Sequence, residues 1–161
     1  MNAAVFWSAV GVILVAIYIT WTAGRLDRMH ARVDAAWAGL DAQLVRRAAA
    51  ARALLGELPE GAVRADLAAA AGASLEAGVD GRQEVENQLS RALRSAVPLI
   101  SPSQLADLAT AVQRVGLARS FHNSAVTDTR VLRRRRLPRL LRLAGHRALP
   151  DFFDMDDTGL S

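Results

Sequence analysis

The sequence contains no cysteine, no lysine and few aromatic residues, and each shortage removes a class of function. The absence of cysteine excludes disulfides, thiolate nucleophiles and cysteine-ligated zinc or iron–sulfur sites. All 20 basic residues are arginine, so no lysine is present for Schiff-base chemistry. The sequence also lacks a G-x-G-x-x-G or phosphate-loop motif, which leaves nucleotide chemistry without support. A length of 161 residues predicts one small domain.

The histidines and the hydroxyl residues show no pattern typical of catalysis or metal binding. His30, His122 and His146 are far apart, and none belongs to a pair with metal-ligand spacing. Ser124 and Asp128 share a helix face, but no nucleophile turn or oxyanion-hole loop accompanies them. We therefore expect a protein that is not an enzyme and that uses no cofactor or metal ion.

Charge is distributed in blocks along the chain. The first 24 residues carry no charged side chain, and residues 25–129 balance twelve arginines against twelve acids. Residues 130–147 then carry eight arginines without an acid, whereas residues 148–161 carry four aspartates without a base. The formal net charge of +4 therefore conceals one strongly basic segment and one acidic tail.

A membrane span is predicted near the N-terminus. The nineteen residues 3–21, AAVFWSAVGVILVAIYITW, carry no charge. A helix of that length spans roughly 28 Å, close to the ~30 Å hydrocarbon core of a bilayer. Trp7 lies near one end, and Tyr18 and Trp21 lie at the other, where amphipathic rings favour the interface. A cleaved signal peptide is the alternative, but no basic residue precedes the run, so an uncleaved anchor is favoured.

The flanks of the span predict its orientation. Arg25, Arg28 and Arg32 follow the span, whereas only the α-amino group precedes it. The positive-inside rule then places the N-terminus outside the cell and residues 25–161 in the cytoplasm.

Apolar residues beyond the span recur at three- and four-residue steps, which predicts long helices. The first helix continues to about Leu58, before Pro59, and Arg47 interrupts its apolar stripe. That stripe consists of His30, Val33, Trp37, Leu40, Leu44, Ala51, Leu54 and Leu58. A second helical stretch covers 62–97, with an interruption at 78–81 that is either a kink or a turn. A third helix is expected to begin at the N-cap Ser101, with Gln104 completing a capping box, and to continue toward Pro138.

These patterns predict an all-α fold: an N-terminal transmembrane helix that continues into an antiparallel bundle of long helices. We favour three helices, with four as the alternative if the interruption is a true turn. The expected organisation is a transmembrane anchor over 1–24, a cytoplasmic helical bundle over 25–137 and a basic-then-acidic tail over 138–161. Alanine, leucine and valine dominate the bundle, and Trp37 and Phe121 are its expected large core residues.

Two sequence blocks resemble the LemA family of membrane-anchored bacterial helical proteins. Residues 32–47, RVDAAWAGLDAQLVRR, resemble the family signature R-V-D-x-A-W-A-x-[IL]-D-x-Q-L-x-R-R. Residues 118–126, ARSFHNSAV, are similar to A-R-x-x-Y-N-x-A-V, with His122 in place of the tyrosine. A looser match is GHRALPDFF at 145–153, which resembles G-F-K-x-x-P-x-[FY]-F.

The chain departs from the family after the first block. Residues 48–53 read AAAARA where the family has D-L-I-P-N-L, and the middle region matches poorly. The resemblance implies an all-helical, non-enzymatic protein that is anchored in a bacterial cell membrane and faces the cytoplasm.

The blocks that carry the resemblance supply candidate contacts with a partner or within the bundle. Asp34 and Asp41 lie a heptad apart beside the apolar seam. Arg119 is their expected mate, because a guanidinium fork can hold a carboxylate with two hydrogen bonds. We favour this structural role over a ligand site. The candidate contacts are Asp34, Trp37, Asp41, Arg46, Arg47, Arg119, Asn123, Phe152 and Phe153.

The arginine-rich segment 130–143 has three interpretations: a solvated helix end, a nucleic-acid contact and an anionic-lipid contact. Tethering to a membrane and the lack of interleaved aromatic residues argue against nucleic acid. Leucines between the arginines favour an amphipathic helix on anionic lipid, provided that the segment reaches the bilayer. The candidate lipid contacts are Arg133, Arg134, Arg135, Arg136, Arg139 and Arg142.

The acidic tail contains two adjacent phenylalanines, Phe152 and Phe153, which a solvated end does not need. We slightly favour docking of the tail onto the chain's own bundle over docking into a pocket of a partner.

The expected function is a non-catalytic scaffold or adaptor that binds other membrane or cytoplasmic proteins and can also self-associate as a homo-oligomer. An accessory subunit of a larger membrane assembly, such as a respiratory-chain complex, is the alternative. A peripheral lipid-binding role of the arginine-rich segment is a residual alternative.

Overall fold

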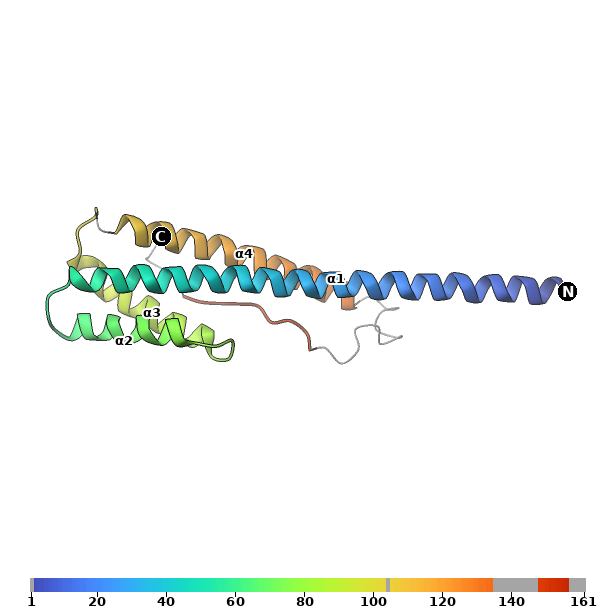
Figure 1. The fold of residues 1–161 in the computed structure, drawn as a ribbon, viewed down its shortest axis with the longest axis horizontal. Helices are drawn as coiled ribbons and strands as arrows, with labels where there is room; N and C mark the ends of the chain where they lie inside the picture. Colours follow the sequence, from blue (N-terminus) through green and yellow to red (C-terminus); the bar gives the residue numbers. More distant parts are fainter. Residues whose placement is uncertain (1, 104, 135–147, 157–161) are drawn as a thin grey trace. The chain divides into compact units, whose positions relative to one another are not determined.

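A computed structural model describes residues 2–103, 105–134 and 148–156 (Figure 1). This part of the chain contains four α-helices and no β-strand, which confirms the all-α class. The helices are α1 (Ala3–Ala53), α2 (Ala62–Glu76), α3 (Arg82–Ala96) and α4 (Ala106–Arg134). Short 3-10 turns, η1 (Leu54–Gly56) and η2 (Val97–Leu99), follow α1 and α3.

Helix α1 carries the predicted membrane span. It runs without a break to Ala53, because it contains no proline and only scattered glycines. It is the one helix of the described ranges that is long and apolar enough to cross a membrane, and no residue of its apolar window is buried. The large side chains of this window, such as Trp7 and Val12, are exposed. Length and composition are therefore those of a membrane-spanning helix.

The stretch 62–97 is two helices, so the preference for three long helices was wrong and the four-helix alternative is right. Helix α2 ends where Ala77 adopts an extended backbone, and α3 begins after Gly81, which has a left-handed backbone with φ of 75°. Both conformations break the helical hydrogen-bond pattern, so the interruption is a turn. The turn lets α2 and α3 pack side by side (Figure 1).

We expect Gly81→Ala to lower the free energy of unfolding by about 1–2 kcal/mol, because an alanine is strained in the left-handed conformation. No atom lies within 4 Å of the position that its Cβ would take, so the effect comes from the backbone alone. The control is Gly78→Ala, which also meets nothing within 4 Å and has no left-handed φ. Chemical denaturation of both variants measures the difference, and equal values for the two would contradict this explanation.

The start of the last helix also differs from the prediction. Helix α4 begins at Ala106, beyond the predicted N-cap Ser101, and the Ser101 hydroxyl lies 3.2 Å from that of Ser103. Helix α4 continues as far as Arg134, as expected, whereas Gln104, the predicted partner in the capping box, and the last predicted positions, 135–138, lie outside the described residues. The chain instead enters α4 through the η2 turn, which contains Pro98.

The chain divides into two compact units. The anchor unit consists of residues 1–35 and 124–151, and the bundle unit consists of residues 36–123 and 152–161. Helices α1 and α4 each contribute residues to both units. The predicted boundary of the anchor at residue 24 concerns the membrane environment, and it stays a prediction.

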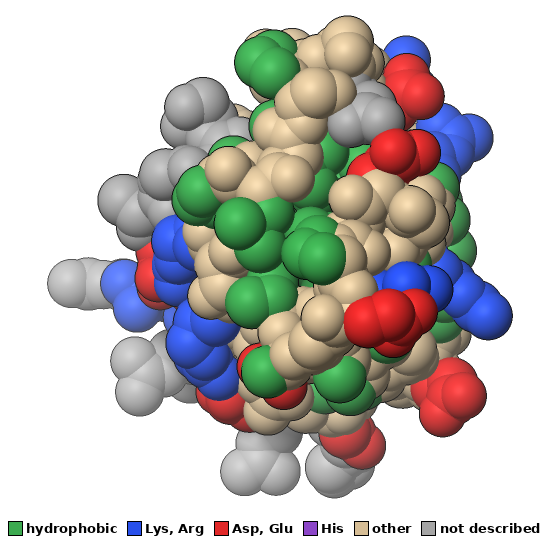
Figure 2. Space-filling model, turned by 90° about the vertical axis from the view of Figure 1, so that its left-hand side faces the viewer, with side chains coloured by type: hydrophobic (Ala, Val, Ile, Leu, Met, Phe, Trp, Pro, Cys, Tyr) green, Lys and Arg blue, Asp and Glu red, His purple; other side chains and the backbone are tan. Residues whose placement is uncertain are grey.

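The main core of the bundle unit is built from small and medium apolar side chains of all four helices. It consists of Ala48, Ala51, Leu54, Leu58, Leu67, Ala70, Ala71, Leu89, Leu93, Ala96, Ile100, Leu108 and Val112. Within each helix these residues recur at steps of one, three or four residues, which places them on one face. Seen from the left-hand side of Figure 1, hydrophobic side chains occupy the centre of the face and charged side chains lie around its edge (Figure 2).

A second, smaller core of the bundle unit contains an aromatic residue from the C-terminal segment. It consists of Leu40, Leu44, Val115, Phe153 and Met155, with Trp37 and Ala118 packed against it. The prediction of Phe121 as a core residue was wrong, since 64% of it is exposed. Val115 and His122 are both buried, and their spacing of seven residues places them on one face of α4. Phe121 is the residue before His122, so it lies to the side of that face.

Candidate functional site

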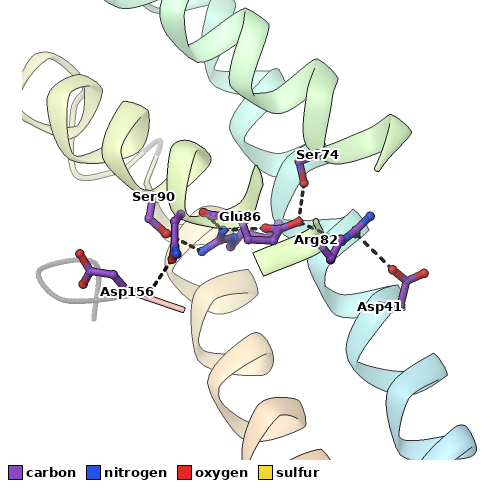
Figure 3. Close-up of polar contacts among 8 residues, drawn as sticks. Asp41, Ser74, Arg82, Glu86, Ser90 and Asp156 are labelled. Carbon is purple, nitrogen blue, oxygen red and sulfur yellow. Dashed lines mark hydrogen bonds and ion pairs between the residues drawn. The ribbon is translucent and has the colours of Figure 1, made fainter. Parts of the chain in front are cut away.

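A cluster of charged and hydroxyl side chains lies inside the bundle unit (Figure 3). We call it the ionic cluster, and it consists of Asp41 and Arg47 from α1, Ser74 from α2, and Arg82, Glu86 and Ser90 from α3. All of these side chains except that of Asp41 are buried. Charged groups are buried in proteins only when they are paired, so the contacts within the cluster decide its role.

Glu86 is the centre of the ionic cluster. Its Oε2 accepts a hydrogen bond of 2.7 Å from Arg47 Nη2, and its Oε1 accepts one of 2.6 Å from the Ser74 hydroxyl. Arg47 also donates to the backbone carbonyl of Glu86 at 3.0 Å and to the Ser90 hydroxyl at 3.2 Å. One carboxylate therefore connects α1, α2 and α3.

Arg82 links the ionic cluster to the turn between α2 and α3. Its Nη1 donates to the backbone carbonyl of Ala77 at 2.7 Å, where α2 ends. Its Nε lies 3.2 Å from Glu86 Oε1 and its Nη2 lies 3.3 Å from Asp41 Oδ1. Both are ion-pair contacts without hydrogen-bond geometry. The two arginines face two carboxylates, so the cluster is formally neutral.

The ionic cluster is suited to positioning helices rather than to chemistry. The Ser74 and Ser90 hydroxyls and the Glu86 carboxylate are buried and are engaged in contacts within the cluster. Among the described residues, no group of three or more His, Asp or Glu side chains is placed to hold a metal ion. We infer that the ionic cluster sets the register of α1, α2 and α3 relative to one another. The apolar faces of these helices are rich in alanine, and their shape alone does not set this register.

A second feature of the bundle unit is the C-terminal strap, which we define as residues 152–156. The strap is extended, and its side chains alternate: Phe153 and Met155 are buried, whereas Phe152, Asp154 and Asp156 are exposed. This alternation is the period of two that an extended chain presents to a surface. We call the surface of the bundle unit that the strap covers the strap groove.

Aromatic contacts hold the buried phenylalanine of the strap. The Phe153 ring lies edge-on to Trp37, with 5.6 Å between ring centroids and 60° between planes. Trp37 also makes an edge contact of 5.5 Å with the ring of His122. Phe153 therefore fills the space between the α1 and α4 segments of the bundle unit, where Leu40 and Val115 lie.

Polar side chains of the bundle bind the main chain of the strap. The Asn123 amide pairs with both main-chain atoms of Phe153: Nδ2 donates to the carbonyl at 3.0 Å, and Oδ1 accepts from the N–H at 2.9 Å. Gln83 donates to the Phe152 carbonyl at 2.9 Å. The Asn87 side chain accepts from the main-chain N–H of Asp156 at 2.8 Å.

Two arginines of the bundle unit contact the far end of the strap. Arg119 donates to the Met155 carbonyl at 2.9 Å, and Arg94 lies 3.1 Å from the carboxylate of Asp156. The strap groove thus combines buried apolar contacts, hydrogen bonds to the main chain and positive charge.

The residues just before the strap are bound within the anchor unit. Arg130 donates from Nε to the Pro150 carbonyl at 2.7 Å, and its Nη2 lies 2.8 Å from Asp151 Oδ1. Arg133 donates to the Ala148 carbonyl at 2.8 Å. Acidic and basic parts of the C-terminal third therefore pair within the chain.

The candidate residues from the sequence have different surroundings. Trp37, Asn123 and Phe153 meet at the strap, whereas 43% of Phe152 is exposed. Asp41 pairs with Arg82 rather than with the expected Arg119, because Arg82 faces α1 from the start of α3. Asp34, Arg46 and Arg134 are exposed, and Arg133 contacts the chain before the strap. Arg135, Arg136, Arg139 and Arg142 lie outside the described residues.

The sequence analysis missed four members of the ionic cluster: Ser74, Arg82, Glu86 and Ser90. A signal for three of them was present. Arg82, Glu86 and Ser90 lie at four-residue steps in phase with the apolar residues Leu89 and Leu93, on the face of α3 that is buried. Charged residues on the buried face of α3, together with Arg47 within the apolar stripe of α1, indicate a buried ion pair.

Comparisons of the chain with protein-family models, with curated proteins and with solved structures find no match.

Proposed function

We propose that this chain is a non-catalytic, single-pass membrane protein whose helical bundle is an adaptor for other proteins. The strap groove is the observation that carries this proposal. It holds the chain's own strap by its main chain and by two apolar side chains, and main-chain hydrogen bonds with side-chain pockets are also used in peptide recognition. The exposed apolar part of α1 supplies the anchor that would keep such an adaptor at a membrane.

We also propose that the chain is a LemA-like protein. The support is that the three blocks that carry the resemblance meet in the bundle unit. Trp37 of the first block contacts His122 of the second and Phe153 of the third, and Asn123 of the second block binds the main chain of Phe153. A substitution at one of these contacting residues would disturb the others, so a family that shares this fold is expected to keep all three blocks.

The proposed location is a bacterial cell membrane, with the N-terminus outside and residues 25–161 in the cytoplasm. The basic flank at Arg25, Arg28 and Arg32 supports this orientation. We expect external protease to leave an epitope at the C-terminus intact in whole cells and to remove it after lysis. Cleavage of that epitope in intact cells would contradict the orientation.

The adaptor proposal is tested by gentle detergent extraction of the full chain, followed by native gel separation and mass spectrometry. We expect several proteins to co-purify with the wild-type chain in amounts below one per chain. The comparison variant is Glu86→Ala, which destabilises the bundle and leaves the anchor sequence unchanged, so it should lose these proteins. Absence of any protein specific to the wild-type chain would contradict an adaptor, and one complex of fixed stoichiometry would identify an accessory subunit instead.

A further inference from the structure

We propose that the strap groove is a binding site for an extended acidic segment of another protein, and that the chain's own strap is the internal ligand that this segment displaces. The inference rests on the proposed adaptor function and assigns it a site and a partner class.

The bonds to the main chain of the strap do not depend on its sequence. Asn123 pairs with both main-chain atoms of one residue, and Gln83, Asn87 and Arg119 each bind one more main-chain atom. Every non-proline residue offers the same donor and acceptor. These four side chains can therefore hold any extended segment that lies in the same register.

The side chains of the strap show which segments fit. Phe153 and Met155 fill the buried positions, and the Asp156 carboxylate lies 3.1 Å from Arg94. Asp154, the one residue between Phe153 and Met155, is exposed, so it adds little selectivity. The matching pattern is an aromatic residue, any residue, a large apolar residue and an acid. Arg94 and Arg119 make the groove complementary to a segment with negative charge.

The strap is bound in a way that permits exchange. Its hydrogen bonds with Gln83 and Asn87 are exposed to solvent, where water can replace either partner. Being part of the same chain, the strap is present at a high effective concentration, which reaches millimolar values for short flexible tethers. A partner segment of similar intrinsic affinity is therefore excluded until the strap leaves or the partner is concentrated at the membrane.

The experiment uses the full chain in detergent micelles and a fluorescent synthetic peptide with the sequence of residues 149–156, followed by fluorescence anisotropy. We expect the Phe153→Ala chain to bind the peptide at least tenfold more tightly than the wild-type chain, because its strap competes poorly. The Phe152→Ala chain is the matched control and should behave as the wild type. Adding Asn123→Ala to the Phe153→Ala chain should weaken binding at least tenfold.

Equal binding of the peptide to the wild-type and Phe153→Ala chains, or binding to neither, would overturn the proposal. If the Phe153→Ala chain loses its helical circular dichroism, excess peptide must restore it, and failure to do so overturns the proposal as well. A wild-type chain that dimerises with rising concentration and binds no free peptide would identify a second copy as the occupant. Partners that still co-purify with an Asn123→Ala chain would leave the adaptor function intact and exclude this groove as its site.

Discussion

Replacing Glu86 with alanine is expected to lower the free energy of unfolding by about 3–5 kcal/mol. Glu86 is fully buried, and its carboxylate pairs with Arg47 at 2.7 Å and with Arg82 at 3.2 Å. Its removal leaves Arg47 charged in an environment of low dielectric constant, without the carboxylate that compensates it. The loss is measured by denaturant unfolding of the full chain in micelles, followed by circular dichroism.

Two further variants separate the buried charge from the loss of side-chain volume. Glu84→Ala, on the same helix, should change stability little, because Glu84 is exposed and its contacts with Arg91 and Gln88 are also exposed. The double variant Arg47→Met with Glu86→Leu should recover most of the stability, since apolar residues of similar volume often replace a buried ion pair without loss. A loss below about 1 kcal/mol for Glu86→Ala would show that water reaches the ionic cluster.

The exposed control pair also has a defined pH dependence. The hydrogen bond that Arg91 donates to Glu84, together with one from Gln88, lowers the pKa of the Glu84 carboxyl. Because the folded pKa lies below the unfolded one, the contribution of this pair is present above the unfolded pKa and is lost as the pH falls through the folded pKa.

Phe153→Ala is expected to lower the free energy of unfolding by about 3 kcal/mol, the lower end of the usual range for a buried phenylalanine. The side chain is 2% exposed and packs on Leu40, Leu44 and Val115. The loss stays near the lower end because the strap can undock as a whole instead of leaving a cavity. Fluorescence of Trp37 in a background that carries Trp7→Phe and Trp21→Phe reports the change, since the Trp37 ring contacts Phe153.

The control for this variant is its neighbour in sequence. Phe152→Ala removes a ring of which 43% is exposed, so we expect a loss below about 1 kcal/mol. A loss equal to that of Phe153→Ala would mean that the alternation of buried and exposed side chains in the strap does not hold in solution.

The four-helix architecture was only partly predictable from the sequence. The stripe from Val33 to Leu58 is buried as expected, except that Trp37 is only partly buried, because a helical period of 3.6 residues places those positions on one face whatever packs against it. The turn at Gly81 was ambiguous, since a glycine permits a left-handed backbone without requiring one. The contacts between α2 and α3 decide in favour of the turn.

The sequence by itself determined the local properties of this protein: an uncharged helical stretch long enough to cross a membrane, amphipathic helices and a tail with two phenylalanines that need burial. Only the tertiary structure decided that Arg47 is paired with Glu86, that Arg82 rather than Arg119 binds Asp41, and that Phe153 rather than Phe121 lies in the core. The physical reason is that period and propensity act over a few neighbouring residues. The partner of a buried charge or ring depends instead on which segments, distant along the chain, pack face to face.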